Sequence, residues 1–224
     1  MSSSWKAEIL AVLRKELRSE IRAKSGLTTA GLFGVVTVFT ISFASINTKL
    51  NGSIAAGLFW VAVLFSGVIS LPRTFIVEEE QGTGDLLRLW ARPHAVFWGK
   101  AMFNFTQIAI MAGILGFLYV GFAALTIKVL WLFAFSLFGG CAALAGAVTL
   151  TGAIVAKAAN RAALAGAIAV PILMPIMAMG VVALREAFGA GFEGTGQLAA
   201  MGMLAYATAT LAIGPWLFAS IWKS

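Results

Sequence analysis

Hydrophobic and polar positions are sharply separated along the chain. Six long apolar stretches contain no Asp, Glu, Lys, Arg or His, and they cover 28–46, 54–72, 101–125, 129–156, 162–184 and 198–221. Crossing the hydrocarbon layer of a bilayer takes about 20 apolar residues at roughly 1.5 Å rise per residue. The pattern therefore predicts six transmembrane helices, with every charged residue of the chain outside them.

The composition agrees with this pattern. The chain has 224 residues, of which 60% are hydrophobic and 11% charged, whereas soluble domains have about 45–50% apolar and about 25% charged residues. Its one cysteine, Cys141, excludes a disulfide framework, and the single histidine argues against a metal site. We expect an all-α integral membrane protein in which 1–224 form a single transmembrane domain.

Lysine and arginine are distributed unequally between the two sides of the predicted helices. Thirteen of the sixteen lie in the N-terminal segment, in the loops after the second and fourth stretches, and at the C-terminus; the other three are Lys49, Lys128 and Arg185. Cytoplasmic loops concentrate these residues, so both termini are predicted to be cytoplasmic. The formal net charge of +7 then reflects topology and lipid contact, and no nucleic-acid partner is needed to explain it.

Residues 1–25 are predicted to form an amphipathic interfacial helix. At 100° per residue, the apolar side chains from Trp5 to Ile21 gather on one half of the helix. Arg14, Arg18 and Arg22 follow its flank at intervals of four, where they can meet lipid phosphates. Glu16 and Glu20 fall within the apolar half, so an alternative interpretation is that these two carboxylates face a partner subunit.

The predicted cytoplasmic loop 73–100 differs from the other loops in length and content. Its sequence is RTFIVEEEQGTGDLLRLWARPHAVFWGK. The three glutamates extend the preceding helix, Gly82 and Gly84 interrupt it, and Asp85 can cap a short amphipathic helix that Pro93 closes. The apolar side of such a helix needs either lipid or a groove on another protein.

The same loop carries a family resemblance. The segment EEEQGTGDLL at 78–87, followed by Pro93 and Gly99-Lys100, resembles the permeases of ABC-2 type transporters. Together with Glu16–Leu27 and Ala56–Phe75, it makes the chain similar to the haem exporter protein B family (CcmB) of cytochrome c maturation. The resemblance implies a type II ABC exporter-like transmembrane domain in the bacterial cytoplasmic membrane.

The resemblance also implies partners and residue roles. The partners are an ABC ATPase subunit, a second copy of the chain, a haem-handling membrane protein and lipids. The short helix is the coupling helix, which docks on the ATPase: Leu86, Leu87 and Leu89 fill its groove, and the glutamates face its basic residues. The complete expected interface is Glu78, Glu79, Glu80, Gly82, Thr83, Gly84, Asp85, Leu86, Leu87, Leu89, Pro93 and Lys100. The alternative is a solvated charged loop whose short helix faces lipid.

ATP hydrolysis is expected on a separate chain. The sequence has no G-x-x-x-x-G-K-[ST] phosphate-binding loop, and Gly99-Lys100 is followed by Ala101. We therefore expect a non-catalytic subunit with no directly bound cofactor, with ATP on the partner and haem as a possible cargo.

Signals inside the predicted membrane helices are weaker. Small residues at Gly139/Ala143 and Ala142/Gly146 favour close helix packing, either within one chain or across a dimer. Pro171 and Pro175 should kink their helix, as a hinge or as a fixed bend. Helix packing accounts for the methionines near the outer end, which are Met174, Met177, Met179, Met201 and Met203. The Gly-rich outer loop 185–197 is predicted to be a flexible connection.

Three other functions remain open from the sequence. The first is an ABC-2 type permease for a lipid, a polysaccharide or a drug. The second is a secondary transporter, which usually places ionisable residues near the middle of the membrane. The third is a membrane-embedded enzyme, which needs a reactive constellation at membrane depth. The six uncharged stretches disfavour the last two.

Overall fold

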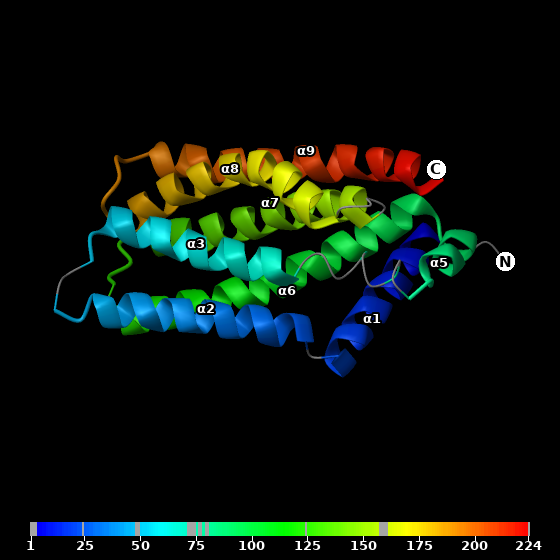
Figure 1. The fold of residues 1–224 in the computed structure, drawn as a ribbon. Coiled ribbons are helices and arrows are strands. Elements are labelled where there is room, and N and C mark those ends of the chain that lie inside the picture. Colours follow the sequence, from blue (N-terminus) through cyan, green and yellow to red (C-terminus); the bar gives the residue numbers. More distant parts are fainter. Residues whose placement is uncertain are drawn as a thin grey trace.

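A computed structural model describes residues 4–23, 25–47, 50–70, 75, 78, 81–123, 125–156 and 161–223. All regular structure in these ranges is helical, so the all-α prediction is confirmed for the described residues. Six long helices lie side by side, while α1 and α5 lie together at one end of this bundle (Figure 1). The helices are α1 (Trp5–Ala23), α2 (Ser25–Ala44), α3 (Gly52–Ser70), α5 (Gly84–Trp90), α6 (Pro93–Phe122), α7 (Leu130–Ala156), α8 (Arg161–Ala187) and α9 (Thr195–Lys223).

The long helices coincide with the six apolar stretches, although they differ in their capacity to cross a bilayer. Helices α6, α7, α8 and α9 are each long and apolar enough on their own. Helix α2 is long and apolar enough only when it is counted together with α1. The two segments, Trp5–Ala23 and Thr28–Ala44, are bent by 69° relative to each other. In α3 the apolar helix is shorter, at Gly52–Val68. Among the described residues, four or five helices therefore meet the length and composition expected of a span.

The start of α6 differs from the sequence prediction. This helix begins at Pro93, eight residues before the predicted start of its span, with Pro93 in its first turn and extended backbone at Arg92. Proline suits this position because its fixed φ angle matches the helix and its missing N–H would have no intrahelical acceptor there. Gly99 and Lys100 therefore lie inside α6, and the loop ends at Arg92.

A tryptophan joins three helices at the centre of the bundle. Trp60 of α3 is fully buried, and its indole ring lies against Gly140 of α7 and Gly180 of α8. A Cβ atom added to either glycine would overlap the ring. The two glycines therefore allow one large aromatic side chain to fill the space between three backbones.

The small residues of α7 pack within the chain. A Cβ on Gly139 would lie 3.4 Å from the Ala200 carbonyl oxygen, and one on Gly146 would lie 3.2 Å from Thr210 Cβ. Both neighbours belong to α9. Close approach of α7 and α9 confirms intrachain packing at these two glycines, and a dimer face on α7 remains a prediction.

The connection between α8 and α9 is a defined turn, so the prediction of a flexible loop was wrong. Its organising residue is Glu186, which is 8% exposed. Its carboxylate accepts hydrogen bonds from the backbone N–H groups of Gly194 at 3.0 Å and Gly196 at 2.6 Å. Gly189 and Gly194 adopt φ angles of 74° and 82°, which glycine tolerates without steric cost. One carboxylate thereby closes the loop onto the start of α9.

Helix α8 continues through both of its prolines. Pro171 and Pro175 are exposed on the surface of the bundle, and the Tyr206 hydroxyl of α9 donates a hydrogen bond to the Ile172 carbonyl at 2.9 Å. This bond ties the proline-containing turn to α9. A hinge at these prolines remains a prediction.

Candidate functional site

Helix α1 packs directly on the beginning of α6. The contact point is Gly99, where an added Cβ would lie 2.7 Å from Val12 Cβ and 3.1 Å from the Ile9 carbonyl oxygen. Val12 is 5% exposed and shares a hydrophobic cluster with Val96 and Phe97 of α6. The absence of a side chain at Gly99 therefore sets how closely α1 approaches the bundle.

Four charged residues meet beside this contact, and we call them the ion cluster: Lys15, Glu16, Glu78 and Lys100. The Lys100 side chain is 0% exposed. Its Nζ lies 2.7 Å from Glu16 Oε1 and 2.9 Å from Glu78 Oε2. Lys15 pairs with Glu78 and lies 3.2 Å from Glu16 Oε1. The cluster thus connects α1, the segment before α5, and α6.

The ion cluster contains two positive and two negative groups in a largely buried place. Buried charges are costly unless they are paired and hydrogen-bonded, and this arrangement pairs Lys100 with both carboxylates. The Lys100 ammonium also lies 4.6 Å from the centre of the Phe75 ring, a favourable cation–π distance. Burial of Lys15, followed by repulsion from Lys100, lowers the pKa of Lys15 from its ordinary value.

A second ion pair connects the same elements closer to solvent. Arg92 Nε lies 3.7 Å from Glu8 Oε1, with the Arg92 side chain 57% exposed. Arg92 is the residue immediately before α6, and Glu8 is in the first turn of α1. Exposed pairs contribute only about 0–1 kcal/mol, so this pair adds little to the packing of Val12 and the buried ion cluster in the attachment of α1.

Helix α5 has one face packed on the bundle. Leu87 packs against the hydrophobic cluster that contains Phe75, Phe97 and Phe218. The Arg88 guanidinium lies 5.4 Å from the centre of the Trp222 ring near the end of α9. These contacts fix α5 against α6 and α9.

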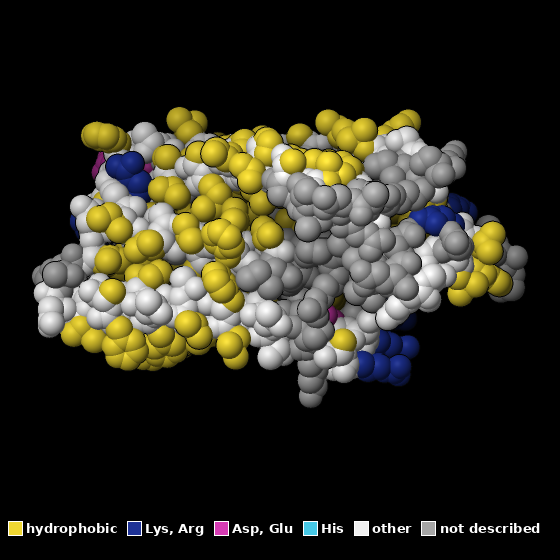
Figure 2. Space-filling model, in the orientation of Figure 1, with side chains coloured by type: hydrophobic (Ala, Val, Ile, Leu, Met, Phe, Trp, Pro, Cys, Tyr) yellow, Lys and Arg dark blue, Asp and Glu magenta, His cyan; other side chains and the backbone are white. Residues whose placement is uncertain are grey.

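The other face of α5 is apolar and open. Leu86 is 62% exposed, Leu89 82% and Trp90 83%. Figure 2 shows hydrophobic side chains along the flank of the bundle, with Lys and Arg near its two ends; α5 lies at the end where the N-terminal helix packs. Exposed apolar groups on so short a helix are typical of a surface that a partner protein or a membrane covers.

The turn before α5 is fixed by backbone geometry. Gly82 has a φ angle of 66°, and the Thr83 N–H and hydroxyl donate to the Glu78 carbonyl at 3.0 Å and 3.3 Å. Thr83 is the N-cap residue of α5, so Asp85 does not have the predicted capping position. Gly84 is the first residue of α5 and has no left-handed conformation.

The structure divides the predicted docking residues into an exposed and an internal group. Leu86 and Leu89 are exposed, and Trp90, which was missing from the predicted interface, belongs with them. Glu78, Lys100 and Leu87 point into the chain itself, so the first two are assigned to the ion cluster. Pro93 is half-buried at the start of α6. Glu79, Glu80 and the side chain of Asp85 lie outside the described residues.

The residues singled out in the N-terminal helix α1 likewise fall into buried and exposed groups. Glu16 pairs with Lys100 of its own chain, so its apolar-side position does not require a partner subunit. Glu20 is half-buried. Trp5, Arg14, Arg18 and Arg22 are exposed, and their contact with lipid remains a prediction.

A polar face of α6 continues from the ion cluster into the bundle. Lys100, Asn104 and Gln107 follow one another at helical spacing and are all buried. Asn104 Nδ2 donates a hydrogen bond to Thr149 Oγ1 of α7 at 2.9 Å. This bond links the inner part of α6 to the neighbouring helix, four residues beyond Lys100.

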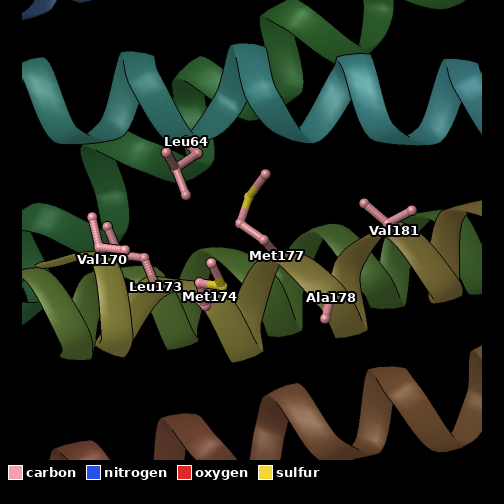
Figure 3. A pocket seen from close by; sticks show the side chains of 7 residues that line it. All are labelled: Leu64, Val170, Leu173, Met174, Met177, Ala178 and Val181. Atoms are coloured by element: carbon pink, nitrogen blue, oxygen red, sulfur yellow. The ribbon is translucent and has the colours of Figure 1, made fainter.

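A groove of about 560 Å³ lies between α3 and α8. Figure 3 shows Leu64 of α3 opposite Met177 of α8 across it. Its remaining lining residues are Val170, Leu173, Met174, Ala178 and Val181. Because all of these side chains are apolar, the groove offers packing or lipid contact and no polar chemistry.

The other methionines are accounted for by packing or by an exposed position. Met203 is fully buried, Met179 packs against Gly202, and Met201 is 57% exposed. Within the described residues, no three His, Cys, Asp or Glu side chains come together as a metal site would require.

These features define a multi-pass α-helical membrane protein with a compact, charged junction at one end and an apolar surface helix beside it. Comparison with known proteins is more specific. Residues 7–222 match the CcmB protein family, so the chain belongs to that family. It is similar to heme exporter protein B of Rhodobacter capsulatus, with 28% identity over 214 residues that cover 94% of this chain and 96% of the relative.

Proposed function

We propose that this protein is the membrane-spanning permease subunit of an ABC transporter that acts in cytochrome c maturation. In this function it couples ATP hydrolysis on a separate subunit to haem export or to the release of a haem-loaded chaperone. Membership of the CcmB family over nearly the whole chain supports the proposal. So does the relative in Rhodobacter capsulatus, which is named a heme exporter protein.

The observation that carries the proposal is the open apolar face of α5. Leu86, Leu89 and Trp90 project from a short helix whose opposite face is fixed to α6 and α9. A surface helix held in this way can receive force and pass it to the bundle. The partner expected here is an ABC ATPase, which binds the ATP, while the permease itself is non-catalytic.

The finer architecture belongs to the same proposal. It comprises six spans in a type II ABC exporter-like arrangement, with both termini and the α5 end on the cytoplasmic side of the bacterial inner membrane. The unequal distribution of Lys and Arg supports this orientation. A homodimer of this chain, in contact with a haem-handling membrane protein, completes the proposed complex.

Co-purification with the ATPase tests this function. The tagged permease is expressed with a candidate ABC ATPase subunit from the same organism, and the ATPase retained after detergent extraction is measured. We expect the wild-type permease to retain it and Leu89→Asp to lose it, because the new charge would be desolvated in the interface. Gln81→Asp is the matched control, since it adds the same charge at an exposed position just before α5.

Each alternative outcome is informative. If the wild-type chain retains no ATPase, the transporter assignment fails. If Leu89→Asp retains as much as the wild type, α5 is not the docking surface. Normal c-type cytochromes in cells that lack this permease would refute the role in cytochrome c maturation and favour an ABC-2 type permease for another substrate.

A further inference from the structure

We propose that α1 is a moving part of the coupling unit, and that Lys100 is the positioning residue that makes α1, α5 and the start of α6 move as one body. This inference rests on the proposed function and deepens it. The sequence-based interpretation places α1 on the lipid surface. The contacts of α1 also connect it to both ends of the segment that contains α5.

The first of these connections lies before α5 and is made by Glu78. Glu78 binds Lys100 through its side chain at 2.9 Å and holds the Thr83 N–H through its backbone carbonyl at 3.0 Å. Thr83 is the N-cap of α5. A displacement of α5 is therefore transmitted to Glu78 across one turn and from Glu78 to the ion cluster.

The second connection lies after α5. Helix α5 ends at Trp90, and Arg92, two residues later, pairs with Glu8 of α1 at 3.7 Å. Glu8 and Glu16 are separated by about two helical turns of α1. Helix α1 therefore contacts the chain on both sides of α5, and we call α1 with these two contacts the brace.

Because Lys100 is buried, displacement of α1 along or away from α6 is costly. Lys100 is 0% exposed and serves Glu16 and Glu78 at the same time. Moving α1 away from α6 would leave charges unpaired where water does not reach them, which costs far more than shifting the whole assembly. The contact of Val12 with Gly99 adds close steric packing beside the charges.

Distance measurements on the assembled complex test whether α1 and the segment before α5 form one rigid body. Spin labels are placed at Ala11→Cys on α1 and Gln81→Cys before α5, both exposed, in a Cys141→Ala background. The permease–ATPase complex in nanodiscs is measured with and without a non-hydrolysable ATP analogue. For the distance between the two labels within one protomer, we expect one narrow distribution that nucleotide does not shift, and a broadened one in Lys100→Met. A nucleotide-dependent shift in the otherwise wild-type complex would overturn the proposal.

Charge exchange separates positioning from simple loss of structure. Lys100→Glu should reduce cytochrome c maturation in cells by about tenfold or more, since it puts a third carboxylate in the buried site, while the ATPase still co-purifies. The double variant Glu16→Lys/Lys100→Glu keeps two positive and two negative groups and should recover maturation. Lys6→Met, which removes an exposed charge of α1, is the control without effect.

The two proposals fail in different ways. Loss of ATPase binding by the wild-type permease would refute the proposed function. If cells with Lys100→Glu mature cytochrome c normally and the ATPase stays bound, the proposed role of the brace is refuted and the proposed permease function is not. If Lys100→Glu does not accumulate in the membrane, the double variant decides: accumulation without recovered maturation contradicts the positioning role, and recovery supports it.

Discussion

The two ends of the helical bundle use buried carboxylates in opposite ways. At the α5 end, Glu16 and Glu78 pair with lysines that are up to 84 residues away in the sequence. At the other end, Glu186 accepts hydrogen bonds from backbone N–H groups only eight and ten residues away. The first arrangement joins separate elements, and the second closes a local turn.

This contrast shows which end connects distant parts of the chain. The Glu186 carboxylate, which binds backbone groups of its own loop, fixes that loop and the start of the next helix. A lysine shared by two carboxylates from different segments makes the position of each depend on the other. Long-range coupling is therefore expected at the α5 end, and local rigidity at the other end.

The largest expected effect is the loss of Lys100. Lys100→Met leaves two buried carboxylates with one partly exposed lysine, and breaking a buried pair costs about 3–5 kcal/mol. Thermal unfolding of the permease in nanodiscs should show a correspondingly large decrease in melting temperature. Lys6→Met is the control, and an equal decrease in that variant would mean that total charge, not pairing, matters.

A smaller and more local effect is expected at Glu186. Glu186→Gln replaces one acceptor oxygen by an NH₂ group that opposes a backbone N–H, at a cost of about 1.5–3 kcal/mol. Hydrogen exchange should increase within 186–196 and stay unchanged in α1 and α5. The exposed Glu193→Gln provides the control. Faster exchange that extends to α1 would contradict the assignment of a purely local role.

The smallest effect is expected at the exposed ion pair. Arg92→Gln removes the contact with Glu8 while Lys100 and its partners remain, so we expect a change in unfolding free energy of about 0–1 kcal/mol. High salt should weaken the wild-type pair and reduce the difference between the two proteins. A loss as large as that of Lys100→Met would place the main attachment of α1 at Arg92.

Much of the fold is predictable from the sequence because membrane helices must satisfy their own backbone hydrogen bonds within a long apolar segment. The stretches that contain α7 and α9 show this directly. The start of α6 was less predictable: loop-like charged residues suggested a later start, whereas Pro93 is a good first residue of a helix.

The ion cluster could not be predicted, since local patterns do not report pairing between residues more than sixty positions apart. Lys100 was expected in a docking surface because it ends a family motif, and Glu78 because it begins one. One signal was available: Lys100, Asn104 and Gln107 share one helical face, which indicates a polar seam inside the bundle. The two carboxylates that meet this seam required the three-dimensional structure.

The ion cluster also has a consequence for how the protein is synthesised and assembled. Helix α1 leaves the ribosome before the partners of its charged residues, because Glu78 follows Lys15 by 63 residues and Lys100 follows Glu16 by 84. Until two further apolar helices have been synthesised, Glu16 therefore lacks its long-range partner Lys100 and has only the neighbouring Lys15. Its basic, exposed flank gives it a place at the membrane surface during this interval, and its final docking completes the assembly of this end of the bundle.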